Sequence, residues 1–243
     1  MSLSPAKIAT LLLLLTAMHH ARADDPAPGT QVPQVFQRPG RPDSKLGYLL
    51  YLPRDYQKST RSPLLLFLHG SGERGTDINL VKKHGPPKLI GQGQHLPFVV
   101  VSPQCPPEGR WEADLLLALL DDLNSKYSID PARVYVTGLS MGGLGTWSLI
   151  GAAPDRFAAA IPICGHSAPW VAEPASRLPV WIIVGDRDNH LLAGNCYGMA
   201  QSLQARGADV KLTVMHGVGH DSWTQSYATP ELYDWLLRHR RGE

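Results

Sequence analysis

Short runs of apolar residues, bounded by turn residues, recur along the chain from residue 32 onward. The run 64–68 contains only leucine and phenylalanine and leads directly into a glycine-rich turn. Continuous apolar runs of this length are typical of strands whose two faces are both buried. The pattern predicts strands at 32–37, 46–52, 63–68, 98–102, 133–137, 158–163, 180–184 and 210–215.

Longer segments between these runs carry apolar residues three or four positions apart, as one face of an amphipathic helix requires. In the segment 112–127, leucines form such a stripe beside Asp121 and Asp122. We predict helices at 112–127, 143–150, 194–206 and 231–240. Strands that alternate with helices predict an α/β fold, a mostly parallel sheet of about eight strands flanked by helices on both faces. The sequence shows no repeat, no second domain and no insertion large enough for a lid.

The N-terminal segment has the composition of a secretory signal peptide rather than of a folded element. Lys7 precedes a short apolar run, 8–18, and Ala21-Arg22-Ala23 is a typical cleavage site. Because the run is too short to span a bilayer, we expect cleavage after Ala23 and a secreted or periplasmic protein without stable membrane insertion. Residues 1–23 are then the signal peptide, 24–31 a polar, flexible tether and 32–243 a single globular domain.

The formal net charge of +2 falls to 0 when Lys7 and Arg22 leave with the signal peptide. The remaining charges are scattered, so the chain lacks the basic patch that a nucleic-acid-binding protein needs. Three cysteines remain after cleavage, Cys105, Cys164 and Cys196. An oxidising compartment would permit one disulfide among them, and three buried thiols are the alternative.

One turn carries a chemical signal, because Gly138-Leu139-Ser140-Met141-Gly142 joins a predicted strand to a predicted helix. Glycines on both sides of a serine let the strand and the helix approach closely, while the serine hydroxyl stays exposed on a strained backbone. Ser140 is therefore our candidate nucleophile. The alternative is an ordinary turn in which Ser140 caps the helix.

A serine hydroxyl needs a general base, commonly a histidine that a carboxylate orients. Downstream strand ends supply histidines, and in a parallel sheet these ends lie at the same edge as Ser140. His220 follows Gly217 and Gly219 in a loop that we expect to be mobile, which favours it over His216 at the strand end. His190 is a weaker candidate because it lies on a different loop.

Two further loops supply the candidate acid and the candidate oxyanion-binding groups. Asp186 and Asp188 both follow the strand 180–184, and both remain candidates for the acid. The backbone N–H groups of Met141, after the nucleophile, and of Ser71, after the strand 63–68, are the candidate oxyanion donors. We expect His69 to brace this second loop rather than to take part in chemistry.

Seven motifs lie between residue 46 and the C-terminus. They are Tyr48-Leu-Leu-Tyr-Leu-Pro53, Leu66-Phe-Leu-His-Gly-Ser-Gly-Glu-Arg-Gly75, His84-Gly-Pro-Pro-Lys88, Ser102-Pro-Gln-Cys-Pro106, Thr137-Gly-Leu-Ser-Met-Gly-Gly143, Ile161-Pro-Ile-Cys-Gly165 and Gly219-His-Asp-Ser-Trp223. Through them nearly the whole mature chain resembles the α/β-hydrolase superfamily. More narrowly, it resembles the secreted bacterial phospholipase/carboxylesterase, dienelactone-hydrolase-like group, whose members are often described as esterases or predicted peptidases.

The resemblance implies an α/β-hydrolase fold and a secreted serine hydrolase that cleaves carboxylic esters through an acyl-enzyme, without a cofactor. The acid loop of the family, laid on residues 184–192, implies Asp188 as the acid, although Val184 and Leu192 depart from the family pattern. It also implies that Cys105 and Cys164 pack near strand ends. The implied substrate is a small-molecule or polysaccharide-linked ester. The alternatives are a peptidase or amide hydrolase of the same fold, and a non-catalytic homologue that binds a ligand.

Three tryptophans, Trp111, Trp170 and Trp223, are candidates for the substrate pocket because they lie near predicted strand ends. For each of them the alternative is an aromatic side chain that shields the core. We do not predict a metal site, because the four-residue spacing of His216 and His220 fits zinc only on a helix, and the glycines between them oppose a helix.

Overall fold

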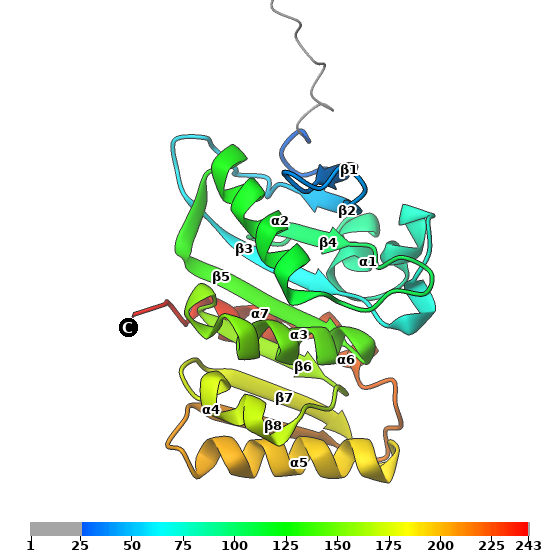
Figure 1. Cartoon of the computed structure of the whole chain (residues 1–243), viewed down its shortest axis with the longest axis vertical. Coiled ribbons are helices and arrows are strands. Elements are labelled where there is room, and N and C mark those ends of the chain that lie inside the picture. The colour runs from blue at the N-terminus through cyan, green and yellow to red at the C-terminus, as the bar shows by residue number, and fades with distance from the viewer. Residues whose placement is uncertain (1–25, 243) are drawn as a thin grey trace, which may run out of the picture.

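The computed structural model describes residues 26–242, which form an eight-stranded sheet between two layers of helices (Figure 1). The strand order is β1-β2-β4-β3-β5-β6-β7-β8. β1 pairs antiparallel with β2, β2 pairs antiparallel with β4, and all later pairs are parallel. The prediction of an α/β fold with a mostly parallel sheet of about eight strands is therefore confirmed. The predicted signal peptide lies outside the described residues.

The strands are β1 (Gln31–Gln37), β2 (Lys45–Tyr51), β3 (Ser62–Leu68), β4 (Val99–Pro103), β5 (Ile129–Leu139), β6 (Ala159–Ile163), β7 (Val180–Gly185) and β8 (Val210–Met215). The helices are α1 (Gly85–Gly91), α2 (Ala113–Lys126), α3 (Met141–Ala152), α4 (Ala172–Ala175), α5 (His190–Gln204), α6 (Trp223–Ala228) and α7 (Pro230–Leu237). Short 3₁₀ turns are η1 (Ser71–Glu73), η2 (Ile78–Lys83), η3 (Pro154–Arg156) and η4 (Pro169–Val171).

Every predicted strand and helix is present, but the sequence pattern missed α1, α4 and α6. These helices are short, and α1 begins with a glycine followed by two prolines, so none of them carries a long amphipathic stripe. Proline is tolerated in the first turn of a helix because its missing N–H would have had no partner there. Packing against the sheet, rather than local periodicity, decides that these segments are helical.

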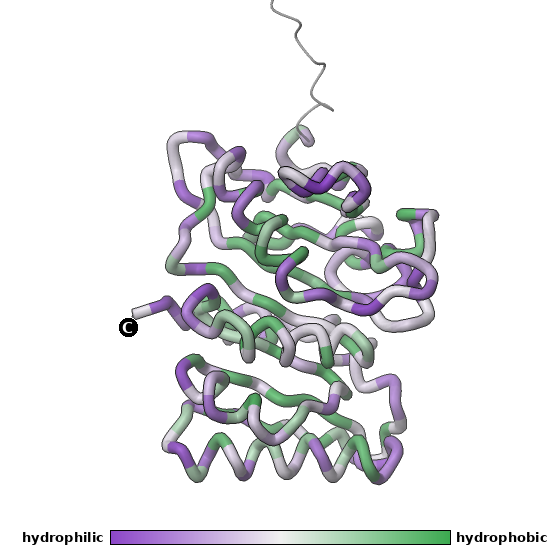
Figure 2. Tube along the Cα trace, in the orientation of Figure 1, coloured by the Kyte–Doolittle hydropathy of each residue, from purple (hydrophilic) through white to green (hydrophobic). Residues whose placement is uncertain are grey.

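The two faces of the sheet are covered by different helices, as the alternation of side chains along β3 illustrates. Leu64, Leu66 and Leu68 pack into a core with α2, α3, α4 and α5, whereas Leu65 and Phe67 pack into a second core with α1, α6 and α7. Successive side chains of a strand point to opposite faces, so an entirely apolar strand serves both cores. The apolar colour concentrated along the central strands in Figure 2 follows from this arrangement.

The described part of the segment 24–31 makes backbone contacts with the sheet. The Gly29 N–H donates a hydrogen bond to the Leu52 carbonyl at 2.8 Å, and β1 already begins at Gln31. Cys105, Cys164 and Cys196 are all free, buried thiols. Among residues 26–242 no helix is long and apolar enough to cross a bilayer.

Candidate active site

Ser140 lies in the sharp turn that the sequence pattern predicted between β5 and α3. Its φ and ψ are 53° and −114°, a left-handed conformation that is strained for a residue with a side chain. A hydrogen bond from the Ser140 N–H to the Ile163 carbonyl, at 2.9 Å, fixes the turn against the neighbouring strand. The flanking glycines are needed sterically, because a Cβ at Gly142 would lie 1.9 Å from the Leu68 carbonyl oxygen and one at Gly138 2.3 Å from the Gly142 oxygen.

We expect Gly142→Ala to destabilise the protein by about 3 kcal/mol, because neither backbone segment can move away from the added methyl group. Gly198→Ala on α5 is the matched control, since a Cβ there meets no atom within 4 Å. That substitution should stabilise the protein by about 0.5–1 kcal/mol, because alanine favours a helix over glycine. Urea denaturation of the two variants measures both effects, and equal stabilities would contradict the steric argument.

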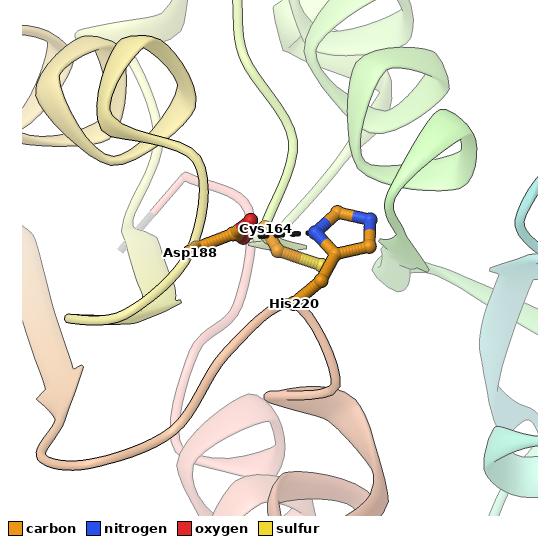
Figure 3. A group of neighbouring side chains, drawn as sticks. All are labelled: Cys164, Asp188 and His220. Carbon is orange, nitrogen blue, oxygen red and sulfur yellow. Dashed lines mark hydrogen bonds and ion pairs between the residues drawn. The ribbon is translucent and has the colours of Figure 1, made fainter.

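The structure brings Ser140, His220 and Asp188 into one chain of hydrogen bonds. His220 Nε2 lies 2.9 Å from Ser140 Oγ. On its other side, His220 Nδ1 lies 2.8 Å from Asp188 Oδ2, the contact that Figure 3 shows as a dashed line. The Asp188 side chain is 4% exposed, whereas that of His220 is 44% exposed, so the carboxylate is enclosed and the imidazole faces the open edge of the sheet. This is the geometry in which a carboxylate orients a histidine beside a nucleophile.

The two aspartates of the β7–α5 loop have separate partners. Asp186 accepts a hydrogen bond from the Gly217 N–H at 2.7 Å and pairs with His216 Nδ1 at 3.1 Å. Desolvation acts to raise the pKa of the Asp186 carboxyl, but these two hydrogen bonds, together with the electrostatic effect of His216 and Arg187, outweigh it and hold the pKa below its usual value. Asp186 and His216 therefore hold the two loops together, and only Asp188 reaches His220.

Close backbone contact keeps these two loops in place. A Cβ at Gly185 would lie 2.2 Å from the Val218 carbonyl oxygen, and the Arg187 N–H donates to that same carbonyl at 2.9 Å. The Ser222 N–H also donates to the His220 carbonyl, at 2.8 Å. Several backbone contacts thus hold the loop that presents the histidine.

Cys164 lies beside the Asp188–His220 pair, and the sequence pattern did not single it out for the site. The sulfur, one carboxylate oxygen and one imidazole nitrogen lie within 4.8 Å of one another (Figure 3). These atom types suit zinc, but burial raises the pKa of the Cys164 thiol to about 12, so the sulfur is a protonated thiol at neutral pH. We interpret Cys164 as packing support, on a backbone that is itself strained at a φ of 40°.

The loop after β3 is braced by His69, as predicted. The His69 ring accepts the Cys105 N–H at Nε2, 3.0 Å away, and its Nδ1 lies 2.6 Å from the Gly70 carbonyl. The Trp111 indole N–H donates to the His69 carbonyl at 3.1 Å. Burial lowers the pKa of His69, which keeps the ring neutral and suits one donating and one accepting nitrogen.

The candidate oxyanion donors begin two adjacent helical turns. Ser71 is the first residue of η1 and Met141 the first residue of α3, and both line the same cavity. Neither backbone N–H has a hydrogen-bond acceptor among residues 26–242. The first N–H groups of a helix lack intrahelical partners and attract negative charge, so both remain able to bind an oxyanion.

Two cavities adjoin the candidate site. The larger, about 760 Å³, is lined by residues of α3, by Trp111, by Arg74 and Arg110 and by residues 166–168 of the β6–α4 loop. The smaller, about 450 Å³, is lined by His166 of the β6–α4 loop, by Asn189, the N-cap of α5, and by Leu191, Leu192 and Asn195 of α5. His166 lines both cavities. The sequence analysis missed this residue, although its place just after a parallel strand would have brought it to the same edge of the sheet.

The three predicted pocket tryptophans have three different environments. Trp111 lines the larger cavity while it also supports His69. Trp170 is 79% exposed and lines neither cavity, so the structure does not bring it to the site. Trp223 also lines neither cavity, and its ring instead lies against His220, with the centroids 5.3 Å apart.

Comparison with known proteins gives a consistent picture. A model of the dienelactone hydrolase family matches residues 106–230, which is more than half of the chain. A thermostable esterase of known structure superimposes with a TM-score of 0.75 and 31% identity, and the match covers 87% of this chain and 63% of that one.

Two curated relatives match over shorter stretches of the chain. The poly(3-hydroxyalkanoate) depolymerase C of Paucimonas lemoignei is 38% identical over 80 residues, which are 33% of this chain and 19% of the depolymerase. The bifunctional acetylxylan esterase/xylanase of Neocallimastix patriciarum is 27% identical over 137 residues, which are 54% of this chain and 20% of that protein. The matched stretch thus spans about a fifth of either relative. On the family match and the fold, the chain belongs to the dienelactone hydrolase family of the α/β-hydrolase superfamily.

Proposed function

We propose that this protein is a secreted serine hydrolase that cleaves carboxylic esters through an acyl-enzyme. The observation that carries the proposal is the hydrogen-bond chain from Ser140 through His220 to Asp188, with distances of 2.9 and 2.8 Å, at the open edge of the sheet. The names of the similar proteins, a thermostable esterase, an acetylxylan esterase/xylanase and a poly(3-hydroxyalkanoate) depolymerase, support an ester as the substrate. The signal-peptide pattern of residues 1–23 supports export.

In the proposed reaction, His220 Nε2 takes the hydroxyl proton while Ser140 Oγ attacks the ester carbonyl carbon. The Asp188 carboxylate holds the imidazole by its Nδ1–H and stabilises the imidazolium that forms. The N–H groups of Ser71 and Met141 bind the oxyanion of the tetrahedral intermediate. His220 then protonates the departing alkoxide, and a water molecule, deprotonated by the same histidine, hydrolyses the acyl-enzyme. No step requires a metal or a cofactor.

We infer that the substrate is a small-molecule or polysaccharide-linked ester with a sizeable apolar or aromatic group. The cavity beside Ser71 and Met141 is lined by Trp111, Leu144 and Trp147, and pockets of a few hundred cubic ångströms with such linings bind most of a ligand's apolar surface. An acetyl group alone would leave this cavity largely unfilled. The open approach to His220 suits an ester whose other side is attached to a larger molecule.

A series of p-nitrophenyl esters from acetate to decanoate, hydrolysed by the purified mature protein, tests this proposal. We expect kcat/KM to rise about fourfold with each added methylene until the acyl chain fills the cavity, because each buried methylene adds about 0.8 kcal/mol of binding. A fluorophosphonate should label Ser140, and peptide mass spectrometry would identify the labelled residue. Absence of both hydrolysis and labelling would contradict the proposed function and favour a ligand-binding role, whereas labelling together with amide but not ester hydrolysis would favour a peptidase.

A further inference from the structure

Two loops from distant parts of the chain meet at the candidate site. We call residues 69–75, which follow β3, the oxyanion loop, and residues 216–222, which follow β8, the histidine loop. Among the residues that the structure describes, no hydrogen bond or ion pair joins one loop to the other. Two aromatic side chains outside the cavities, His84 and Trp223, lie between them and contact both.

Trp223 is the first residue of α6, and its ring lies edge-to-face against two imidazoles. Its centroid is 5.3 Å from that of His220, with an angle of 88° between the planes, and 5.6 Å from that of His84, with an angle of 69°. The indole nitrogen is buried and has no hydrogen-bond partner among residues 26–242. Packing between the two imidazoles, rather than a hydrogen bond, therefore sets the position of this ring, and edge-to-face aromatic contacts at this separation are favourable.

His84 connects this ring to the oxyanion loop through a buried carboxylate. His84 Nε2 lies 3.6 Å from Glu73 Oε1, and Glu73 Oε2 accepts a hydrogen bond from the Gly70 N–H at 3.1 Å. The Glu73 side chain is only 4% exposed, and Lys83 Nζ, 3.6 Å from Oε1, supplies a counter-charge. Burial lowers the pKa of His84, although the nearby Glu73 carboxylate acts to raise it. The His84 ring is therefore uncharged at neutral pH.

The backbone that carries His84 is held rigidly on the sheet. His84 is the N-cap of α1, and the next residue, Gly85, has a φ of 62°. A Cβ at Gly85 would lie 2.4 Å from the Phe67 ring, so only glycine allows α1 to begin this close to β3. The Phe67 ring in turn packs edge-to-face against Tyr227 of α6, at 5.5 Å. α1 and α6, which carry the two aromatic side chains, are thus fixed to one another.

We propose that His84 and Trp223 are positioning residues that couple the oxyanion loop to the imidazole of His220. The inference rests on the proposed function, because it assigns these two loops to one reaction. His84 and Trp223 line neither cavity, so they act on the alignment of His220 with Ser140 and not on substrate binding. Small displacements of a catalytic group by changes outside the reacting atoms are known to lower rates strongly.

A double-mutant cycle tests the coupling. We expect His84→Leu and Trp223→Leu each to lower kcat about tenfold, with KM unchanged to within about twofold, because alignment and not binding is lost. The double variant should also lose about tenfold rather than about a hundredfold, because both changes break the same bridge. His84→Gln, which keeps a group that reaches Glu73, and Trp223→Phe, which keeps an aromatic ring, should recover most of kcat.

Trp170 provides a matched control, because its side chain is 79% exposed and lines neither cavity. Trp170→Leu should leave kcat unchanged, and its effect should add to that of His84→Leu. The rate of fluorophosphonate labelling at Ser140 serves as a second readout that does not depend on the natural substrate. If a leucine variant does not fold, the same cycle with His84→Asn and Trp223→Met keeps the test in place.

The outcomes separate the two proposals. Additive losses of kcat in the His84 and Trp223 variants, or changes confined to KM, would overturn the coupling. Labelling of the wild-type protein at Ser140 would in that case still support the proposed function. A wild-type protein that neither hydrolyses esters nor labels at Ser140 would overturn both. A non-additive loss in kcat and in labelling rate, with recovery by Trp223→Phe, would support the coupling.

Discussion

Ser140→Ala is expected to lower kcat for ester hydrolysis by about 10⁵-fold, the largest effect of any substitution in this protein. The reason is that the acyl-enzyme cannot form without the hydroxyl that His220 Nε2 contacts at 2.9 Å. The residual rate would come from the oxyanion-binding N–H groups and from substrate positioning, which remain in place. Initial rates with a p-nitrophenyl ester, at enzyme concentrations high enough to detect slow turnover, measure the loss.

The control for this experiment is Ser202→Ala, a serine of α5 that lies in neither cavity. It should retain full activity, and circular dichroism should show that both variants are folded. Because alanine relieves the strain of a side chain at a φ of 53° only slightly, Ser140→Ala should unfold at nearly the same urea concentration as the wild-type protein. Equal hydrolysis rates for Ser140→Ala and the wild-type protein would contradict Ser140 as the nucleophile.

Asp188→Asn is expected to lower kcat by about 10³–10⁴-fold, whereas Asp186→Asn should lower it less than about fivefold. An amide at position 188 removes the negative charge that stabilises the imidazolium and can present an N–H, rather than an acceptor, to Nδ1. Asp186 instead accepts from the Gly217 N–H and pairs with His216, so its loss should chiefly loosen the contact between two loops.

Comparing the two asparagine variants distinguishes a role in the reaction from a role in the loops. For Asp188→Asn we expect an unchanged KM and a slower fluorophosphonate labelling of Ser140, because the nucleophile itself is less activated. For Asp186→Asn we expect a lower thermal midpoint with nearly normal labelling. The opposite ranking, with the greater loss of kcat in Asp186→Asn, would show that Asp188 is not the acid.

Local patterns in the sequence were sufficient for the strands, the long helices and the turn at Ser140. An uninterrupted apolar run such as 64–68 fits a strand buried on both faces, and the leucine stripe of 112–127 fits a helix, because each pattern reflects the period of one regular structure. The turn was predictable since its glycines are required by contacts within the strand–turn–helix unit itself. The parallel order of strands then placed Ser140, both aspartates and His220 at one edge.

Only the tertiary structure decided which of the neighbouring residues meet. Asp186 and Asp188 are two positions apart and chemically identical, and the difference between them lies in the path of the β7–α5 loop against the histidine loop. The same holds for the three tryptophans, which the sequence analysis grouped together because all lie near strand ends. In the structure, Trp111 lines a cavity, Trp170 lies on the surface and Trp223 packs against His220. Contacts of this kind join residues far apart in sequence, and their distances depend on the packing of loops and short helices that carry no periodic signal. The sequence by itself therefore determined the fold and the edge of the sheet at which the candidate site lies, and the packing at that edge determined which residues of the site contact one another.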